Sequence, residues 1–261
     1  MSEIISDSFL GLSVSIFTSE ELFNYFYEVL ESREPHIFYG YSIGLLPLLK
    51  KHPKLIDYCN KYDLMVTDGR IFYLLAKFYG IPVKHDISIP NMVIKLLQIA
   101  NEKKYSVMLF GANEKNNRHA TNNIREKYPQ AVIIDGISGY YENEDETQVI
   151  NYISSKRPDI LLVGTNTPHK EIFSTNMKNK LNTKIIIPCG GMIDVLSGEK
   201  HLTPLWLKKM GFAWLYRLIQ QPFERLVITT QFCFMFFKIV PYLIFKKIKL
   251  IKTEKNILDF L

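Results

Sequence analysis

The chain has 261 residues, of which 47% are hydrophobic and 22% charged, so it is long enough for one large domain or for one domain with an appendage. This composition excludes a disordered or collagen-like protein. The three cysteines, Cys59, Cys189 and Cys233, lie far apart and form neither a C-x-x-C motif nor a cluster with histidines. We therefore expect no disulfide framework and no zinc site, which favours a reducing cytoplasm. The acidic first residues do not resemble a secretory signal.

The net charge of +6 is unevenly distributed along the chain. Residues 200–261 contain 11 Lys/Arg and 3 Asp/Glu, a net charge of +8, which leaves −2 for residues 1–199. This shift predicts a first domain over 1–199 and a basic appendage over 200–261. Because the basic residues flank a strongly apolar stretch, they favour an anionic membrane surface over nucleic acid as the partner.

Short β-rich runs alternate with helical patterns between about residues 10 and 190. The later runs are continuously apolar, as expected for parallel strands that are covered on both faces. The alternation predicts an α/β fold with a Rossmann-like open, mostly parallel sheet and helices on both faces. The expected strands are 12–17, 36–40, 64–66, 105–110, 131–135, 159–163 and 184–188, and the expected helices are 19–31, 69–79, 91–103, 114–127, 144–156 and 168–181.

Several strands in the second half end in a glycine-bearing turn, at 109–113, 137–141, 162–168 and 188–194. Such turns are common in ordinary α/β proteins, because they make tight connections from a strand to a helix. Four of them at one sheet edge would form a nucleotide-sized cleft, since glycine lets a ligand approach the backbone. The sequence has no G-x-G-x-x-G and no Walker motif, which disfavours the common NAD and ATP sites. It also has no D-x-D, the spacing with which many metal-dependent sugar transferases hold a divalent cation on a diphosphate.

One carboxylate lies directly after an expected strand, in the T-D-G turn formed by Thr67, Asp68 and Gly69. Asp68 could cap the helix that follows, by accepting hydrogen bonds from its first N–H groups. It could instead lie at the mouth of the sheet, where ligands of α/β proteins bind, and act as a general base. One side chain could serve both roles.

A long ordered set of motifs resembles the WecG/TagA/CpsF family of bacterial glycosyltransferases over most of the chain. The motifs are T-D-G (67–69), L-F-G-A (109–112), Y-P (128–129), G-Y-Y (139–141), R-P-D-I-L-L-V-G (157–164), T-P-H-K-E (167–171), C-G-G-M-I-D-V-L-S-G (189–198), T-P-L-W (203–206) and G-F-A-W-L-Y-R-L-I-Q-Q-P-F-E-R (211–225).

This resemblance implies an inverting transferase of cell-surface polysaccharide synthesis at the cytoplasmic face of the membrane, with Asp68 as the base and no cofactor. The implied donor is a UDP-sugar and the implied acceptor is a sugar on a polyprenyl diphosphate. Candidate donor-binding residues are Gly69, Gly111, Gly139, Tyr140, Gly164, Lys170, Glu171, Gly191 and Asp194. Asp194 could accept from ribose or uracil, or cap a helix, and Tyr140 could stack on the base or simply pack.

Without a metal, helix amino termini and cations must neutralise the leaving diphosphate. The candidate cations are Lys84, Lys170, Arg217 and Arg225. Arg217 and Arg225 could contact either the donor diphosphate or the acceptor. Alternatively, these two arginines are solvated surface residues. Pro222 is expected to break the helix between Arg217 and Arg225, so that both can turn toward the cleft.

The sequence departs from the family pattern at several positions of the expected donor site. Lys170 replaces a glutamine, G-Y-S at 40–42 replaces T-x-N, and D-I-S-I-P-N at 86–91 replaces R-x-x-G-x-D, with Asn91 at the second acidic position. L-T-P replaces R-A-P, and Ala213 replaces an acidic residue. These changes motivate a rival hypothesis, a catalytically weak membrane-bound subunit that supports another transferase.

The apolar segment 226–245 is about as long as the roughly 20 residues that cross a bilayer. Lys238 and Pro241 lie within it, and basic residues lie at both ends, so charge asymmetry gives no orientation. We favour a helix that lies in the membrane interface over a true span. The core helix of a homo-oligomer is a third alternative.

Overall fold

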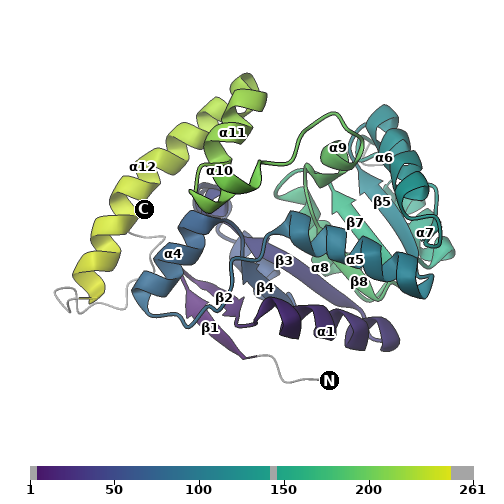
Figure 1. Cartoon of the computed structure of the whole chain (residues 1–261), viewed down its shortest axis with the longest axis horizontal. Helices are drawn as coiled ribbons and strands as arrows, with labels where there is room; N and C mark the ends of the chain where they lie inside the picture. Colours follow the sequence, from purple (N-terminus) through teal and green to yellow (C-terminus); the bar gives the residue numbers. More distant parts are fainter. Residues whose placement is uncertain (1–4, 142–145, 248–261) are drawn as a thin grey trace.

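The computed structural model describes residues 5–141 and 146–247, which form an α/β fold around one six-stranded sheet (Figure 1). All paired strands of this sheet are parallel, in the order β4-β3-β8-β7-β5-β6. The predicted Rossmann-like fold class is therefore confirmed. The strands are β3 (His36–Tyr41), β4 (Leu64–Thr67), β5 (Ser106–Gly111), β6 (Val132–Ile133), β7 (Ile160–Gly164) and β8 (Ile185–Pro188).

Helices cover both faces of the sheet, because side chains alternate between the faces along each buried strand. Phe38, Leu109 and Leu162 point to the face that is covered by α1 (Ser19–Glu31), α5 (Ile89–Lys103), α6 (Glu114–Lys127) and α9 (Met192–Leu196). Ile37, Met108 and Leu161 point to the opposite face, beneath α7 (Glu146–Lys156) and α8 (His169–Met177). Near β3 and β4 this second face is covered by α2 (Leu46–Lys51), α3 (Leu55–Cys59), α4 (Arg70–Tyr79) and α12 (Pro222–Lys247).

Two helices begin and end where the sequence predicts, and each starts at an amino-terminal cap. Thr18 and Glu21 form a capping box at the start of α1, and the Asn113 side chain accepts from the Asn116 N–H at the start of α6. The start of the helix expected at 144–156 falls partly outside the described residues, and its described part is α7.

Other expectations need correction. The strand expected at 12–17 does not join the parallel sheet: β2 (Leu12–Ser15) forms an antiparallel hairpin with β1 (Ser6–Phe9). A 3-10 turn, η1 (Ile43–Leu45), and the short helices α2 and α3 fill the connection between β3 and β4, where no helix was predicted. The helix expected at 168–181 ends earlier, at Met177.

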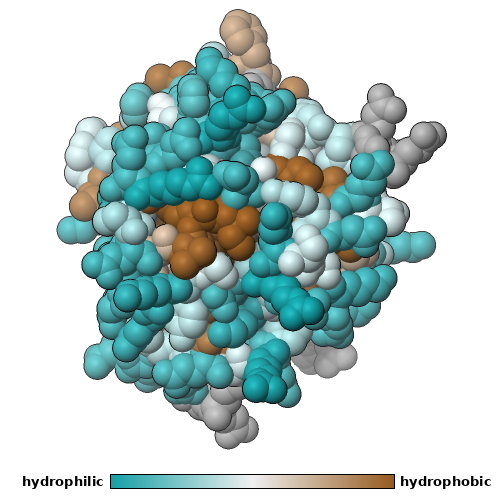
Figure 2. Space-filling model, turned by 90° about the vertical axis from the view of Figure 1, so that its right-hand side faces the viewer, coloured by the Kyte–Doolittle hydropathy of each residue, from teal (hydrophilic) through white to brown (hydrophobic). Residues whose placement is uncertain are grey.

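The edge strand β6 is also shorter than predicted, with only Val132–Ile133 of the expected 131–135. Figure 2 views the molecule from the side on which α6 and α7 lie in Figure 1, and shows a largely hydrophilic surface with a central hydrophobic patch and smaller hydrophobic areas above it.

The C-terminal segment folds back onto the α/β domain through α10 (Leu205–Lys209), α11 (Ala213–Gln220) and α12. Pro222 is the first residue of α12, so the helix break expected between Arg217 and Arg225 is present. One face of α12 is buried in the core with Tyr41 and Phe72; it consists of Met235, Ile239, Tyr242 and Leu243. The opposite face exposes apolar side chains, among them Phe223, Val227, Phe234 and Phe237.

Candidate active site

A cavity of about 350 Å³ lies at the carboxyl ends of β3, β4 and β8, beneath the C-terminal helices. Ser42, Asp68 and Gly191 line it from the three strand ends, and the N-cap and first turn of α5 add residues 88–91. Its charged lining is strongly asymmetric. Among the described residues, Asp68 is the one carboxylate in the lining, and the basic side chains are Arg70, Lys200, Lys208, Arg217 and Arg225. Such a cavity favours an anionic ligand.

Asp68 lies directly after β4, where its N–H donates to the Tyr41 carbonyl at 2.8 Å. The N-cap of α4 is Gly69, at φ +98°, and no side chain makes a cap hydrogen bond there. The structure therefore does not place Asp68 as the cap of this helix, and its carboxyl group lines the cavity instead.

The surroundings of Asp68 favour a proton-accepting carboxylate. Burial raises its pKa, and the nearby Asp86 carboxylate acts in the same direction. Arg217 and Lys208 oppose this shift by stabilising the charged form, as does a hydrogen bond from the Ile89 backbone. A raised pKa makes an ionised carboxylate a stronger base.

Gly40 in β3 makes room for this arrangement. A Cβ atom at position 40 would lie 2.8 Å from Cβ of Asp68 and 2.7 Å from Cγ1 of Ile89, both too close for any real contact. The sequence marked residues 40–42 only as a departure from the family pattern. The structure gives Gly40 a positional reason, since only glycine lets Asp68 and the start of α5 pack against β3.

Basic residues of the C-terminal segment reach the cavity from three helices. Arg217 of α11 and Arg225 of α12 both line it, and the Arg225 Nε atom donates to Gln221 Oε1 at 3.1 Å. Lys208 of α10, which sequence reasoning missed, donates from Nζ to Ser88 Oγ at 2.7 Å and so fastens the segment to the domain. Lys84 is elsewhere: it pairs with Glu21 at 3.0 Å and does not line the cavity.

The glycine turns do come together at one edge of the sheet, and three of them pack backbone against backbone. A Cβ on Gly111 would lie 2.4 Å from the carbonyl carbon of Gly164, its partner in the β5–β7 register. A Cβ on Gly139 would lie 2.9 Å from Cα of Gly111. These glycines therefore permit backbone to approach backbone. Tyr140, next to this cluster, is exposed to solvent.

Lys170 and Glu171 are not among the lining residues of this cavity and form a buried polar network. The Lys170 ammonium group pairs with Glu171 Oε1, which also accepts from the hydroxyls of Tyr39 and Thr167, each at 2.9 Å. Burial and the Glu171 carboxylate raise the pKa of Tyr39 well above its usual value, so its hydroxyl stays a donor. The departure at position 170 is therefore accommodated by an internal ion pair.

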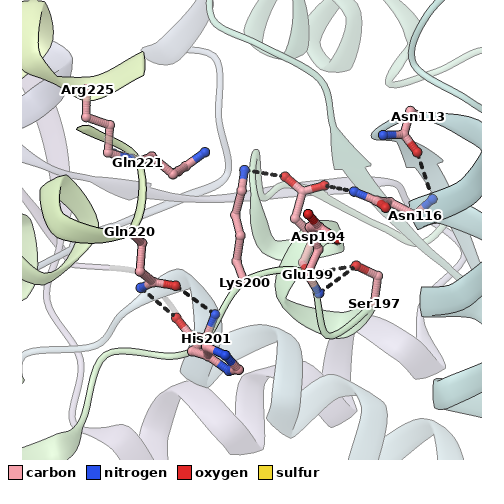
Figure 3. Close-up of polar contacts among 10 residues, drawn as sticks. All are labelled: Asn113, Asn116, Asp194, Ser197, Glu199, Lys200, His201, Gln220, Gln221 and Arg225. Atoms are coloured by element: carbon pink, nitrogen blue, oxygen red, sulfur yellow. Dashed lines mark hydrogen bonds and ion pairs between the residues drawn. The ribbon is translucent and has the colours of Figure 1, made fainter. Parts of the chain in front are cut away.

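Asp194 lies beside the cavity with both carboxylate oxygens bonded (Figure 3). Asn116 Nδ2 donates to Oδ1 at 3.0 Å, and Lys200 Nζ donates to Oδ2 at 2.6 Å. Asp194 is the third residue of α9, and no side chain caps that helix, so the expected cap role is absent. Lys200 lines the cavity and was missed by sequence reasoning; a lone lysine in the S-G-E-K turn gives no chemical signal by itself.

These features define an α/β protein with a cavity at the carboxyl edge of a parallel sheet, lined by basic side chains around one carboxylate among the described residues. The chain belongs to the glycosyl transferase WecG/TagA/CpsF family, whose sequence model matches residues 8–247.

Two curated relatives bear the name N-acetylglucosaminyldiphosphoundecaprenol N-acetyl-beta-D-mannosaminyltransferase. The protein of Bacillus subtilis (strain 168) is 28% identical over 168 residues, which cover 64% of this chain and 65% of the relative. The protein of Staphylococcus aureus (strain MRSA252) is 26% identical over 168 residues, which cover 64% of this chain and 65% of that relative. The match thus spans about 65% of the length of these relatives.

Proposed function

We propose that this protein is an inverting, metal-independent glycosyltransferase that moves a sugar from a UDP-sugar to a polyprenyl-diphosphate-linked saccharide in bacterial cell-surface polysaccharide synthesis. The donor would be N-acetylmannosamine-like or another hexose. The observation that carries the proposal is the cavity that Asp68 lines together with several basic side chains. Family membership and the names of the relatives support the reaction class.

In this proposal Asp68 accepts the proton of the acceptor hydroxyl as the hydroxyl oxygen attacks the anomeric carbon of the donor sugar. The bond from that carbon to the diphosphate breaks, and UDP leaves with the bonding electron pair from the opposite face. Arg217 and Arg225 stabilise the charge that develops on the diphosphate. Both arginines belong to the C-terminal segment, so that segment is part of the catalytic unit.

The C-terminal helices also support attachment to the membrane surface at which a polyprenyl acceptor resides. Arg225–Phe245 is long and apolar enough to cross a bilayer by length and composition, with a mean hydropathy of 1.6. However, one face of α12 packs against the α/β domain, and a helix held there cannot be surrounded by lipid. The opposite, apolar face supports the interfacial arrangement, to which Leu205, Trp206 and Ile219 add exposed apolar surface.

A donor screen with purified full-length protein tests this function. The protein would be mixed with UDP-sugars and a short-chain lipid-diphosphate N-acetylglucosamine acceptor, and the lipid product separated by chromatography. We expect turnover with at least one UDP-sugar. Binding of UDP without turnover of any donor would favour the rival hypothesis of a catalytically weak subunit, and the absence of both would refute the proposal.

A further inference from the structure

Lys200 is joined to Asp194 through its backbone and through its side chain, and Figure 3 shows the side-chain contact. The Lys200 N–H donates to the Asp194 carbonyl at 3.0 Å, which closes the turn that follows α9. The same turn carries the Lys200 side chain back over α9, where Nζ lies 2.6 Å from Asp194 Oδ2. The position of the ammonium group is therefore fixed by the backbone of the turn and by its counterion.

The ammonium group lies at the Gly-Gly turn, on the cavity side of this ion pair. A Cβ on Gly191 would lie 4.0 Å from Lys200 Nζ, and Lys200 lines the cavity whereas Asp194 does not. The Lys200 side chain is 26% exposed and that of Asp194 is 18% exposed. Asp194 thus lies outside the cavity lining and holds the Lys200 side chain at the cavity that Asp68, Arg217 and Arg225 also line.

An ion pair of this kind could serve only to close the turn. Two observations indicate a further role. An ammonium group has three N–H donors, and Asp194 is its one hydrogen-bond acceptor within the described part of the chain, so two donors are available to a ligand. In addition, the pair borders a cavity whose other charged groups are mostly cations.

We propose that Lys200 binds the diphosphate of the nucleotide-sugar donor and that Asp194 positions its ammonium group for this contact. The inference rests on the proposed function and adds a residue to its donor site. Phosphate oxygens accept strong, charge-assisted hydrogen bonds, and a lysine ammonium group is a common ligand for them. Donor binding would also be connected to the C-terminal helices, because the neighbouring His201 exchanges two hydrogen bonds with Gln220 of α11, at 2.9 and 3.2 Å.

Binding of UDP and of uridine to the full-length protein, measured by calorimetry in one detergent, tests the inference. Lys200→Ala should weaken UDP binding by about 10- to 100-fold and change uridine binding by less than about 2-fold, because only UDP carries the phosphates. Lys200→Arg should retain most of the UDP affinity. Lys209→Ala is the matched control, since Lys209 is an exposed lysine of α10 outside the cavity lining.

Equal losses for UDP and uridine in Lys200→Ala would show that the lysine acts only by holding Asp194, and would overturn the inference. Unchanged UDP binding would overturn it as well, while leaving the proposed function intact. Failure of the parent protein to bind UDP at all would refute the nucleotide donor itself, and this inference with it. Thermal unfolding of each variant shows whether the fold is preserved.

Discussion

Replacement of Ile239 by alanine should destabilise the whole protein, although this residue lies in an apolar helix that could cross a membrane by its length and composition. Ile239 is 0% exposed and packs in the same core as Tyr41 and Phe72 of the α/β domain. Truncation of a fully buried isoleucine to alanine costs about 2–5 kcal/mol. At about 2 °C per kcal/mol for a chain of this size, the midpoint of thermal unfolding should fall by roughly 4–10 °C.

Phe237 provides the matched control on the opposite face of the same helix, because it is 76% exposed. Phe237→Ala should change the free energy of unfolding by less than about 0.5 kcal/mol. It should instead weaken binding to anionic vesicles, since a phenylalanine that enters lipid contributes about 1.5–3 kcal/mol. Differential scanning fluorimetry and vesicle co-sedimentation measure the two effects. Equal unfolding midpoints for both variants would refute the packing of α12 on the domain.

Three further predictions concern the cavity and the glycine turns. Burial raises the pKa of Asp68, and the charge of Arg217 opposes this shift. Arg217→Ala should therefore raise the Asp68 pKa further and move the acid limb of the pH–rate profile to higher pH. An unshifted acid limb would argue against electrostatic coupling between the two residues. Transfer should continue in EDTA, and a complete loss that Mg²⁺ or Mn²⁺ restores would contradict the role of the cationic side chains. Gly111→Ala should lower the unfolding midpoint more than Gly198→Ala, because both have positive φ but only Gly111 lacks space for a Cβ; similar shifts measured by fluorimetry would contradict this packing.

Sequence reasoning succeeded where local signals were strong. The helices predicted at 19–31 and 114–127 are α1 and α6, and the continuous apolar runs identify the central strands β5, β7 and β8. It was less accurate where tertiary contacts decide the structure. The strand Leu12–Ser15 has a good β pattern, yet its partner is a neighbouring strand in a hairpin outside the main sheet, which periodicity cannot indicate.

The candidate site was only partly accessible to sequence reasoning, for a physical reason. Asp68 has a local signal, because it follows an apolar strand and precedes a glycine. Lys200 and Lys208 have none, since their proximity to the cavity depends on how the C-terminal helices fold back. The role of Gly40 could not be foreseen either, because the reason for it lies in Asp68 and Ile89, which are distant in the sequence.

The packing of α12 also changes how the C-terminal segment should be tested. A cut after Gln221 would remove Arg225 from the cavity and expose the core that Met235 and Ile239 cover. Loss of activity in such a truncation would therefore not separate membrane attachment from folding or catalysis. Substitutions on the exposed face of α12, such as Phe237→Ala, make this separation because they leave the buried face intact.

The central claim is that Asp68 is the base of a sugar transfer, and turnover by Asp68→Asn tests it most directly. The amide has nearly the same shape but cannot accept the proton, so transfer to the lipid-diphosphate acceptor should fall by about 100-fold or more. UDP binding and the unfolding midpoint should not decrease, because Asp68 caps no helix and a neutral amide suits a site that raises the carboxyl pKa. A folded Asp68→Asn protein that transfers sugar at the parent rate would contradict the claim.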